Sequence, residues 1–180
     1  MSGRLSALAS FILGLPRTVS SQAPSYSPDD FSRLAGGREC PVVVRGNPFA
    51  DQGWSDDDFA AAVIAAMQGR NPGPTTRFTA ETSREGHPAH RIILSFNAGA
   101  TVTAAELCAA SKGHRSEPIG PNGKLHVIAA WCRNGAVASE CSGWIAGVTA
   151  PTDRRFARLI AQVTRDLFPT ATEPGGLKGH

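Results

Sequence analysis

Apolar runs separated by glycine and proline divide the chain into short elements. The β-branched run at 41–46 predicts a buried strand, because Gly46 and Pro48 stop it. Residues 75–81 and 89–97 also predict strands. Turn-forming residues lie between these two segments, so we expect them to pair as a hairpin.

The clearest local pattern is a β-hairpin around Asn134-Gly135. Strand-like residues 125–133 and 136–145 flank this dipeptide, which suits a two-residue turn because both of its positions need positive φ. The register is expected to place Trp131 and Trp144 on one face of the hairpin. It predicts the following opposing pairs: Arg133 and Ala136, Trp131 and Ala138, Ile128 and Cys141, His126 and Gly143.

Apolar residues at helical spacing predict two amphipathic helices. One begins after Ser55, which can cap it, and ends near Gly69. The other begins after Asp153 and ends at Pro169. With a short helix near 103–110, these elements predict an α+β domain of two layers. We expect a mainly antiparallel sheet of four to five strands with two amphipathic helices.

The first 21 residues have the layout of a secretory signal. Arg4 gives a charged start, residues 5–15 are mostly apolar, and small residues follow up to Ser21. We expect residues 1–21 to be a signal peptide and the mature protein to be periplasmic or secreted. The competing interpretation is a poorly ordered N-terminal arm or a short interfacial helix.

The remainder divides into a linker, one domain and a tail. Residues 22–39 hold prolines and glycines among serine and aspartate, which predicts a linker with little regular structure beyond one helical turn near 29–34. Residues 40–169 are expected to form a single domain, and residues 170–180 a flexible tail. We expect no transmembrane helix in the mature chain, since no apolar run reaches about 18 residues.

Charge does not indicate a nucleic-acid partner. The net charge of +3 falls to +1 without residues 1–21, because that segment contains Arg4 and Arg17 and no acidic residue. The basic residues of the last predicted helix form the one cluster, and they fit a solvated helix face. We therefore expect no nucleic acid among the partners.

Four cysteines raise the question of disulfides. No two of them form a C-x-x-C pair, which argues against zinc ribbons and thioredoxin-type sites. The predicted hairpin puts Cys132 and Cys141 on one face but about four strand residues apart, too far for a bond. We expect a disulfide between Cys108 and Cys132. A second pair, Cys40 and Cys141, is left open, as is the alternative that all four are reduced and buried.

The sequence contains no recognisable catalytic constellation, and we expect no cofactor. The weak candidates for a metal are His87 and His90, because nearby imidazoles in a loop can hold zinc or copper, but no third ligand is evident. A cysteine nucleophile at Cys141 lacks a partner, since the predicted register puts His126 on the other face. Phosphate-binding glycine motifs are absent.

Several stretches together resemble a family of small, uncharacterised bacterial envelope proteins. The stretches are VVVRGNPF (42–49), AAMQGRNPGPTTRFT (65–79), HRIILSFN (90–97), AAWCRNGAVASECSGW (129–144) and the final LFP (167–169). The resemblance implies export and no assigned activity. The chain departs from lipoprotein-like members because its first cysteine, Cys40, lies far beyond the apolar start.

The expected function is that of a non-enzymatic, exported cell-envelope protein, acting as a binding or structural module for an unknown protein or small ligand. The alternative is a small metal-binding or hydrolytic enzyme that uses the His87 and His90 region.

Overall fold

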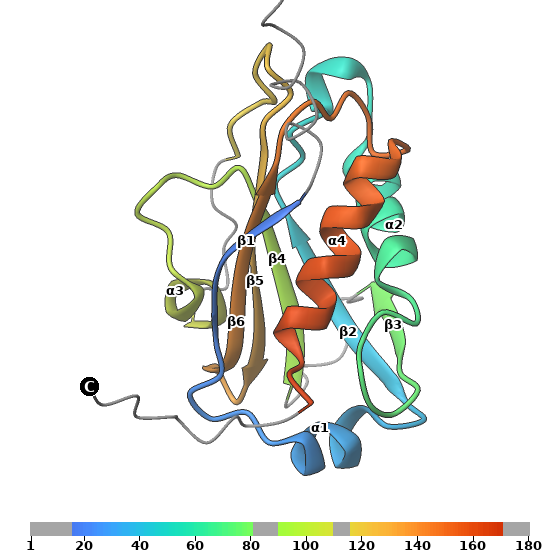
Figure 1. Ribbon diagram of the computed structural model, residues 1–180, viewed down its shortest axis with the longest axis vertical. Helices are drawn as coiled ribbons and strands as arrows, with labels where there is room; N and C mark the ends of the chain where they lie inside the picture. The colour runs from blue at the N-terminus through green and yellow to red at the C-terminus, as the bar shows by residue number, and fades with distance from the viewer. Residues whose placement is uncertain (1–15, 81–89, 110–115, 171–180) are drawn as a thin grey trace, which may run out of the picture.

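The computed structural model describes residues 16–80, 90–109 and 116–170, which form one mixed β-sheet with helices on both faces (Figure 1). The six strands lie in the order β1-β6-β5-β4-β2-β3. The strands are β1 (Arg17–Gln22), β2 (Glu39–Arg45), β3 (Arg77–Ala80), β4 (His90–Phe96), β5 (Leu125–Arg133) and β6 (Ala136–Ile145). The helices are α1 (Pro28–Ala35), α2 (Asp56–Met67), α3 (Ala104–Ala109) and α4 (Arg154–Leu167), with a short 3-10 helix at Ala50–Gln52.

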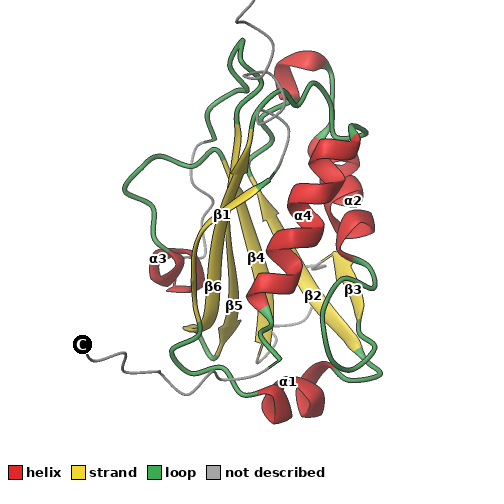
Figure 2. Cartoon of the chain, viewed as in Figure 1, coloured by secondary structure: helices red, strands yellow, loops and turns green. Residues whose placement is uncertain are grey.

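The helices are shared unequally between the two faces of the sheet (Figure 2). α2 and α4 lie side by side on one face and cover the larger apolar core, whereas α3 covers a smaller cluster on the opposite face. The α+β class is confirmed. The short helix expected near 103–110 is present as α3. The expected two layers and four to five strands are an underestimate, because helices cover both faces of a six-stranded sheet that includes β1.

The two long helices begin where their capping residues predict. The Ser55 hydroxyl accepts a hydrogen bond from the Asp58 amide at 3.1 Å, and the Asp153 carboxylate accepts one from the Arg155 amide at 2.8 Å. Each side chain thereby satisfies an amide of the first turn that has no partner within the helix. The apolar stripe of α4 is buried against the sheet.

The expected hairpin between residues 75–81 and 89–97 is wrong. β3 and β4 lie on either side of β2, and both run parallel to it. α2 makes the crossover from β2 to β3, as a parallel pair requires. The apolar run of β2 suits this central position, because parallel strands have helices or other cover on their faces. The sheet is therefore mixed, with three antiparallel and two parallel pairs.

The hairpin of β5 and β6 is confirmed, but its register is right only next to the turn. Asn134 and Gly135 have φ values of 51° and 79°, and Arg133 pairs with Ala136. A β-bulge then adds Ala138 to β6, so that every later pair is displaced by one residue. The observed pairs are Trp131 with Ser139, Ile128 with Ser142 and His126 with Trp144.

This displacement separates the two tryptophans that were expected to share a face. Trp131 is fully buried in the core beneath α4, and its ring centroid lies 5.4 Å from that of Phe31. Trp144 is only half-buried and lines a cavity on the opposite face of the sheet. The same bulge puts Cys132 and Cys141 on opposite faces, and not on one face as expected.

Residues 17–35 are part of the sheet and its core. The Ser21 hydroxyl donates to the Asp166 carbonyl oxygen at 3.0 Å, and β1 pairs with β6 over its length. α1 is longer than the predicted single turn, so the expectation of little further regular structure in 22–39 is wrong. The predicted signal peptide, residues 1–21, therefore overlaps a strand of the fold.

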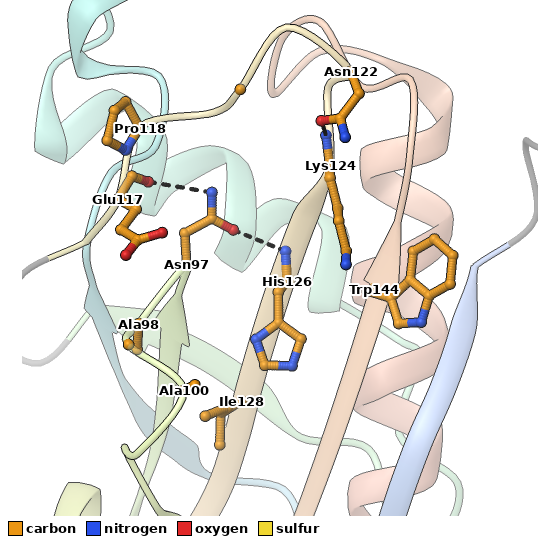
Figure 3. Close-up of a pocket in the computed structure, with 12 residues that line it drawn as sticks. Asn97, Ala98, Ala100, Glu117, Pro118, Asn122, Lys124, His126, Ile128 and Trp144 are labelled. Atoms are coloured by element: carbon orange, nitrogen blue, oxygen red, sulfur yellow. Dashed lines mark hydrogen bonds between the residues drawn. The ribbon is translucent and has the colours of Figure 1, made fainter.

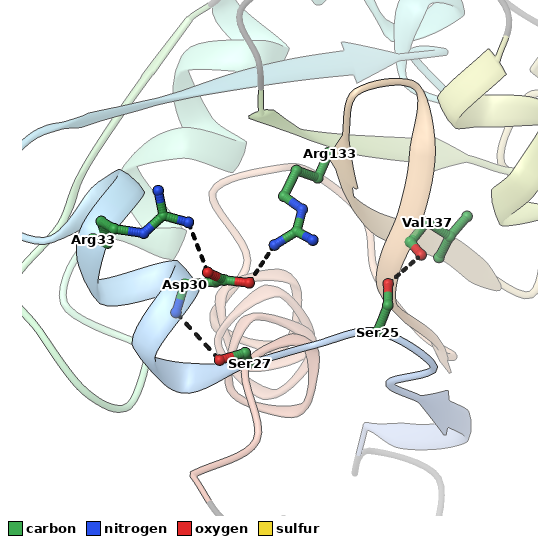
Figure 4. A network of polar contacts seen from close by, with 6 residues as sticks. All are labelled: Ser25, Ser27, Asp30, Arg33, Arg133 and Val137. Atoms are coloured by element: carbon green, nitrogen blue, oxygen red, sulfur yellow. Dashed lines mark hydrogen bonds and ion pairs between the residues drawn. The ribbon is translucent and has the colours of Figure 1, made fainter.

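A polar network fastens α1 to the tip of the β5–β6 hairpin (Figure 4). The Asp30 carboxylate accepts from Arg33 at 2.7 Å and also from Arg133 of β5. These two hydrogen bonds, that from Arg33 first, lower the pKa of Asp30 below its usual range. The Ser25 hydroxyl donates to the Val137 carbonyl oxygen at 3.2 Å, so the residues just before α1 are also bonded to the hairpin.

Candidate functional site

The face of the sheet that carries α3, called here the outer face, is covered only in part. α3 has six residues and is therefore about 9 Å long, whereas the nine-residue β5 extends about 30 Å. The disulfide between Cys108 and Cys132, with a Cα–Cα distance of 5.5 Å, fastens α3 to one end of β5. No helix of the described residues lies above the other end of β5.

A cavity of about 660 Å³ occupies this uncovered end (Figure 3). A second cavity, of about 210 Å³, continues along the sheet and shares His126 and Ile128 with the first. We call the two together the outer groove. The lining residues of the larger cavity are Asn97, Ala98, Gly99, Ala100, Glu117, Pro118, Gly120, Asn122, Lys124, His126, Ile128 and Trp144. The smaller one is lined by Ser20, Val102, Thr103, Ala104, His126, Ile128, Glu140, Cys141 and Ser142.

Asn97 links β5, which forms the floor of the groove, to the 116–119 segment, which forms one of its walls. It follows β4 with a φ of 44°, and its side-chain amide donates to the Glu117 carbonyl oxygen at 3.2 Å. Its side-chain oxygen accepts from the His126 amide at 2.9 Å. Asparagine tolerates this left-handed backbone conformation better than most residues. The strand end, the 116–119 segment and β5 are thereby joined through one side chain.

The opposite wall is an aromatic ring with two cations beside it. The Lys124 ammonium lies 5.3 Å from the centroid of the Trp144 ring, and the Arg17 guanidinium carbon lies 5.8 Å from it. Both distances suit cation–π attraction. Within the described ranges, neither cation has a carboxylate within ion-pair distance. This wall therefore carries positive charge that no carboxylate of the described residues neutralises.

His126 lies between the two walls and is half-buried. Burial is the larger cause that lowers its pKa below the usual value, and the neighbouring Lys124 charge lowers it further. The imidazole is therefore neutral at pH 7. A neutral imidazole can both donate and accept a hydrogen bond, which suits a groove floor that meets polar ligand groups.

Of the two predicted metal candidates, the structure describes only His90. His87 falls outside the described residues. The His90 ring lies at the start of β4 with its Nδ1 at 3.9 Å from the Cys40 sulfur, and burial lowers its pKa. Over residues 16–80, 90–109 and 116–170, no three residues of the His, Cys, Asp and Glu types gather as metal ligands would.

Among the cysteines, the pairing of Cys108 with Cys132 is confirmed. The second pair that the sequence left open does not form, since Cys40 and Cys141 are both free and buried. They lie on β2 and β6, which are three strand spacings, or about 14 Å, apart. Burial raises the pKa of both thiols to about 12. Both are therefore un-ionised at pH 7 and poor nucleophiles.

Sequence reasoning did not find the outer groove. Trp144 and Lys124 carry no motif, and the predicted register turned Trp144 toward the wrong face. One signal was available, since Ser142, Trp144 and Glu140 alternate along β6 with buried residues. Such alternation indicates a strand with one polar or half-exposed face.

Comparison with known proteins gives remote likeness only. No protein-family model matches the chain, and no curated protein matches it. The chain is similar to the PelC dodecamer from Paraburkholderia phytofirmans at 15% identity and a TM-score of 0.43, over 87% of this chain and 100% of that chain. A variant PelC dodecamer from the same organism gives 15% identity and a TM-score of 0.42, over 86% of this chain and 98% of that chain. Likeness at this level supports no conclusion about the chain.

Proposed function

We propose that this chain is a non-enzymatic protein, exported to the cell envelope, that binds a ligand or partner in the outer groove. The groove is the observation that carries the proposal. Its larger cavity, of about 660 Å³, falls within the roughly 300–1,000 Å³ of typical ligand pockets. Polar groups from β5, β6 and two loops converge on it, as in sites that orient a ligand.

Two observations support export. The disulfide between Cys108 and Cys132 is of a kind that persists in oxidising compartments and is rare in the cytosol. The charged and apolar start of the chain is typical of a signal peptide. None of the helices within the described ranges is long and apolar enough to cross a membrane.

The chemistry of the groove favours binding over catalysis. The Ser142 hydroxyl shares a hydrogen bond with the Ser20 hydroxyl at 3.2 Å, and within the described ranges no hydrogen bond joins it to His126, the nearby base. Cys141 is 1% exposed, belongs to the core beneath α4 and is un-ionised. His126 alone does not make a nucleophile–base pair.

Export is tested by fusing residues 1–30 to a reporter enzyme that works only outside the cytoplasm. We expect an active fusion, and an inactive one would sink the exported assignment. The matched control replaces Leu8, Phe11 and Leu13 by Asp in the same fusion. It should abolish activity, because the apolar stretch of a signal peptide is what the export machinery recognises.

Use of the groove is tested in the organism that encodes the protein. Ile128 lines both cavities, so Ile128→Arg should fill the groove floor. A strain with this variant should behave like a deletion strain, although the protein accumulates and melts normally. The control is Ala157→Arg, on the exposed side of α4. A strain carrying folded Ile128→Arg that behaves like wild type would contradict a ligand role for the groove.

A further inference from the structure

We propose that the ligand of the outer groove is an acidic sugar, whose carboxylate is bound by Lys124 and Arg17 and whose ring lies on Trp144. This inference rests on the proposed function, since it names the chemistry of the ligand in that groove. Three features of the walls carry it: cations without an ion-pair partner among the described residues, a half-buried indole, and two carboxylates that likewise form no ion pair there.

The cations select an acidic group. Lys124, the residue before β5, lines the larger cavity, and Arg17 of β1 approaches the same indole from the other side of β6, so both charges lie near the Trp144 end of the groove. Neither forms an ion pair within the described ranges. A carboxylate bound there would accept charge-assisted hydrogen bonds, which are stronger than neutral ones. The exposed Asn122 amide lies at the same end and offers a further donor.

The indole favours a ring with an apolar face beside that acid. Without ligand, Lys124 lies near the ring of Trp144, a contact that is weak at an exposed site. The lysine side chain is flexible, so its ammonium can turn to a ligand carboxylate and leave the ring face open. The apolar face of a pyranose ring fits against an indole in this way, and Ile128 continues the apolar floor.

The carboxylates favour a hydroxylated ring over an aromatic one. Glu117 lines the wall opposite Lys124, and its side chain points into the space between the loop and β5 (Figure 3). Glu140 lines the second cavity. Within the described ranges neither forms an ion pair. Each can accept hydrogen bonds from sugar hydroxyls, whereas an unsubstituted aromatic ring has no hydroxyl to donate to them.

The spacing of these groups indicates more than one sugar unit. Glu140 and Trp144 are four residues apart on β6, or about 13 Å. Ser142 lies between them and His126 lies across the floor, so polar groups continue along the whole length. The groove therefore fits a short acidic oligosaccharide with its acid at the Trp144 end.

The test uses three probes with the full chain. Digalacturonic acid carries the acid and the hydroxyls, galactobiose lacks the acid, and 2-naphthoate has the acid on an aromatic ring. Binding is followed by calorimetry and by the ¹H–¹⁵N signals of the three tryptophan indoles, assigned with Trp54→Phe and Trp144→Phe. We expect digalacturonic acid to shift the Trp144 signal and to bind about tenfold or more tightly than galactobiose.

The variant pair Lys124→Gln and Arg17→Gln should weaken digalacturonic acid binding about tenfold when combined. Arg158→Gln, an exposed cation on α4 at the other face of the sheet, is the matched control and should leave it unchanged. Raising the salt concentration should weaken binding as well, because the cations are exposed.

Each other outcome overturns the inference. Equal binding of galactobiose removes the acid requirement, and tighter binding of 2-naphthoate replaces the sugar by an aromatic acid. No shift of the Trp144 signal at about 10 mM digalacturonic acid removes the ligand class altogether. These results are independent of the reporter fusion and of the Ile128→Arg strain, which test export and the use of the groove.

Discussion

Asn97 and His126 exchange two hydrogen bonds at the floor of the outer groove. The backbone N–H of Asn97 donates to the His126 carbonyl oxygen at 2.9 Å. The backbone N–H of His126 donates in turn to the side-chain oxygen of Asn97, also at 2.9 Å. β4 ends at Phe96, so the second bond uses the Asn97 side chain where a backbone carbonyl would accept in a continuing strand pair. The groove therefore begins where the pairing of β4 with β5 ends.

Asn97→Ala should lower the free energy of unfolding by about 1–3 kcal/mol, because it leaves the His126 amide without its acceptor. Alanine is also less tolerant of the φ of 44° at this position. Urea unfolding measures the loss. Asn97→Asp keeps an acceptor oxygen and should lose less. Equal unfolding midpoints for wild type and Asn97→Ala would show that the bond does not stabilise the fold.

The disulfide that fastens α3 should contribute to stability. The double variant Cys108→Ala and Cys132→Ala opens a cross-link with a sequence separation of 24 residues. The chain-entropy model gives about 3 kcal/mol for a loop of this size. Thermal unfolding should show a lower midpoint for the variant.

Reductant provides the control for this prediction. It should lower the midpoint of the wild type and leave that of the double variant unchanged, since Cys40 and Cys141 are already free. Intact mass before and after reduction should report one disulfide. A wild-type protein whose mass is unaffected by reduction would contradict the bond.

Loss of β1 should destabilise the sheet and make it associate. A protein that begins at Gln22 lacks almost all of β1, whereas one that begins at Pro16 retains it. Without β1, the edge of the ten-residue β6 is exposed, and exposed edges pair with other chains. We expect the shorter form to unfold at lower urea and to sediment as oligomers.

This comparison also bears on where a signal peptidase could cut. Cleavage directly after Ser21 would produce the shorter form. If the two forms are equally stable and both monomeric, β1 is dispensable and that cut is compatible with the fold. If the form that begins at Gln22 is less stable and oligomeric, as expected, a signal peptidase should cleave the exported protein before Arg17.

The titration of His126 should depend on Lys124. Burial lowers the pKa of His126 first and the Lys124 charge lowers it further, so Lys124→Gln should raise that pKa toward the usual range. NMR titration of the imidazole measures the change. Arg158→Gln, remote from the groove, should leave the titration unchanged. An identical titration in Lys124→Gln would exclude the charge effect.

The same shift implies a pH dependence of stability. The folded-state pKa of His126 lies below the unfolded value of about 6.5, so the unfolded chain binds more protons between the two. The stability associated with this group is complete above about pH 6.5 and is lost as pH falls through the folded pKa. The pKa of His90 is also lowered by burial, so this residue contributes in the same direction. Replacing His126 by Gln should reduce the acid-induced fall of the unfolding midpoint but not remove it.

Local patterns predicted most elements because their causes lie within a few residues. Ser55 and Asp153 cap helices through their own side chains, and Asn134-Gly135 makes its turn through its own backbone. The strand neighbours were predicted less well. Residues 75–81 and 89–97 have strand-like composition in either a hairpin or a parallel arrangement, and only the presence of β2 between them decides which.

The sequence by itself determined the α+β class, the caps and turn, and the cysteine partner of Cys132. Tertiary structure decided the order of strands, the bulge at Ala138 and therefore the face on which Trp144 lies. A single inserted residue in β6 reverses the facing of every residue beyond it, because side chains alternate along a strand. The inward-facing Trp131 packs with Phe31 and Phe168, which are distant in the sequence. The outer groove exists because this packing turns Trp131 inward and Trp144 outward.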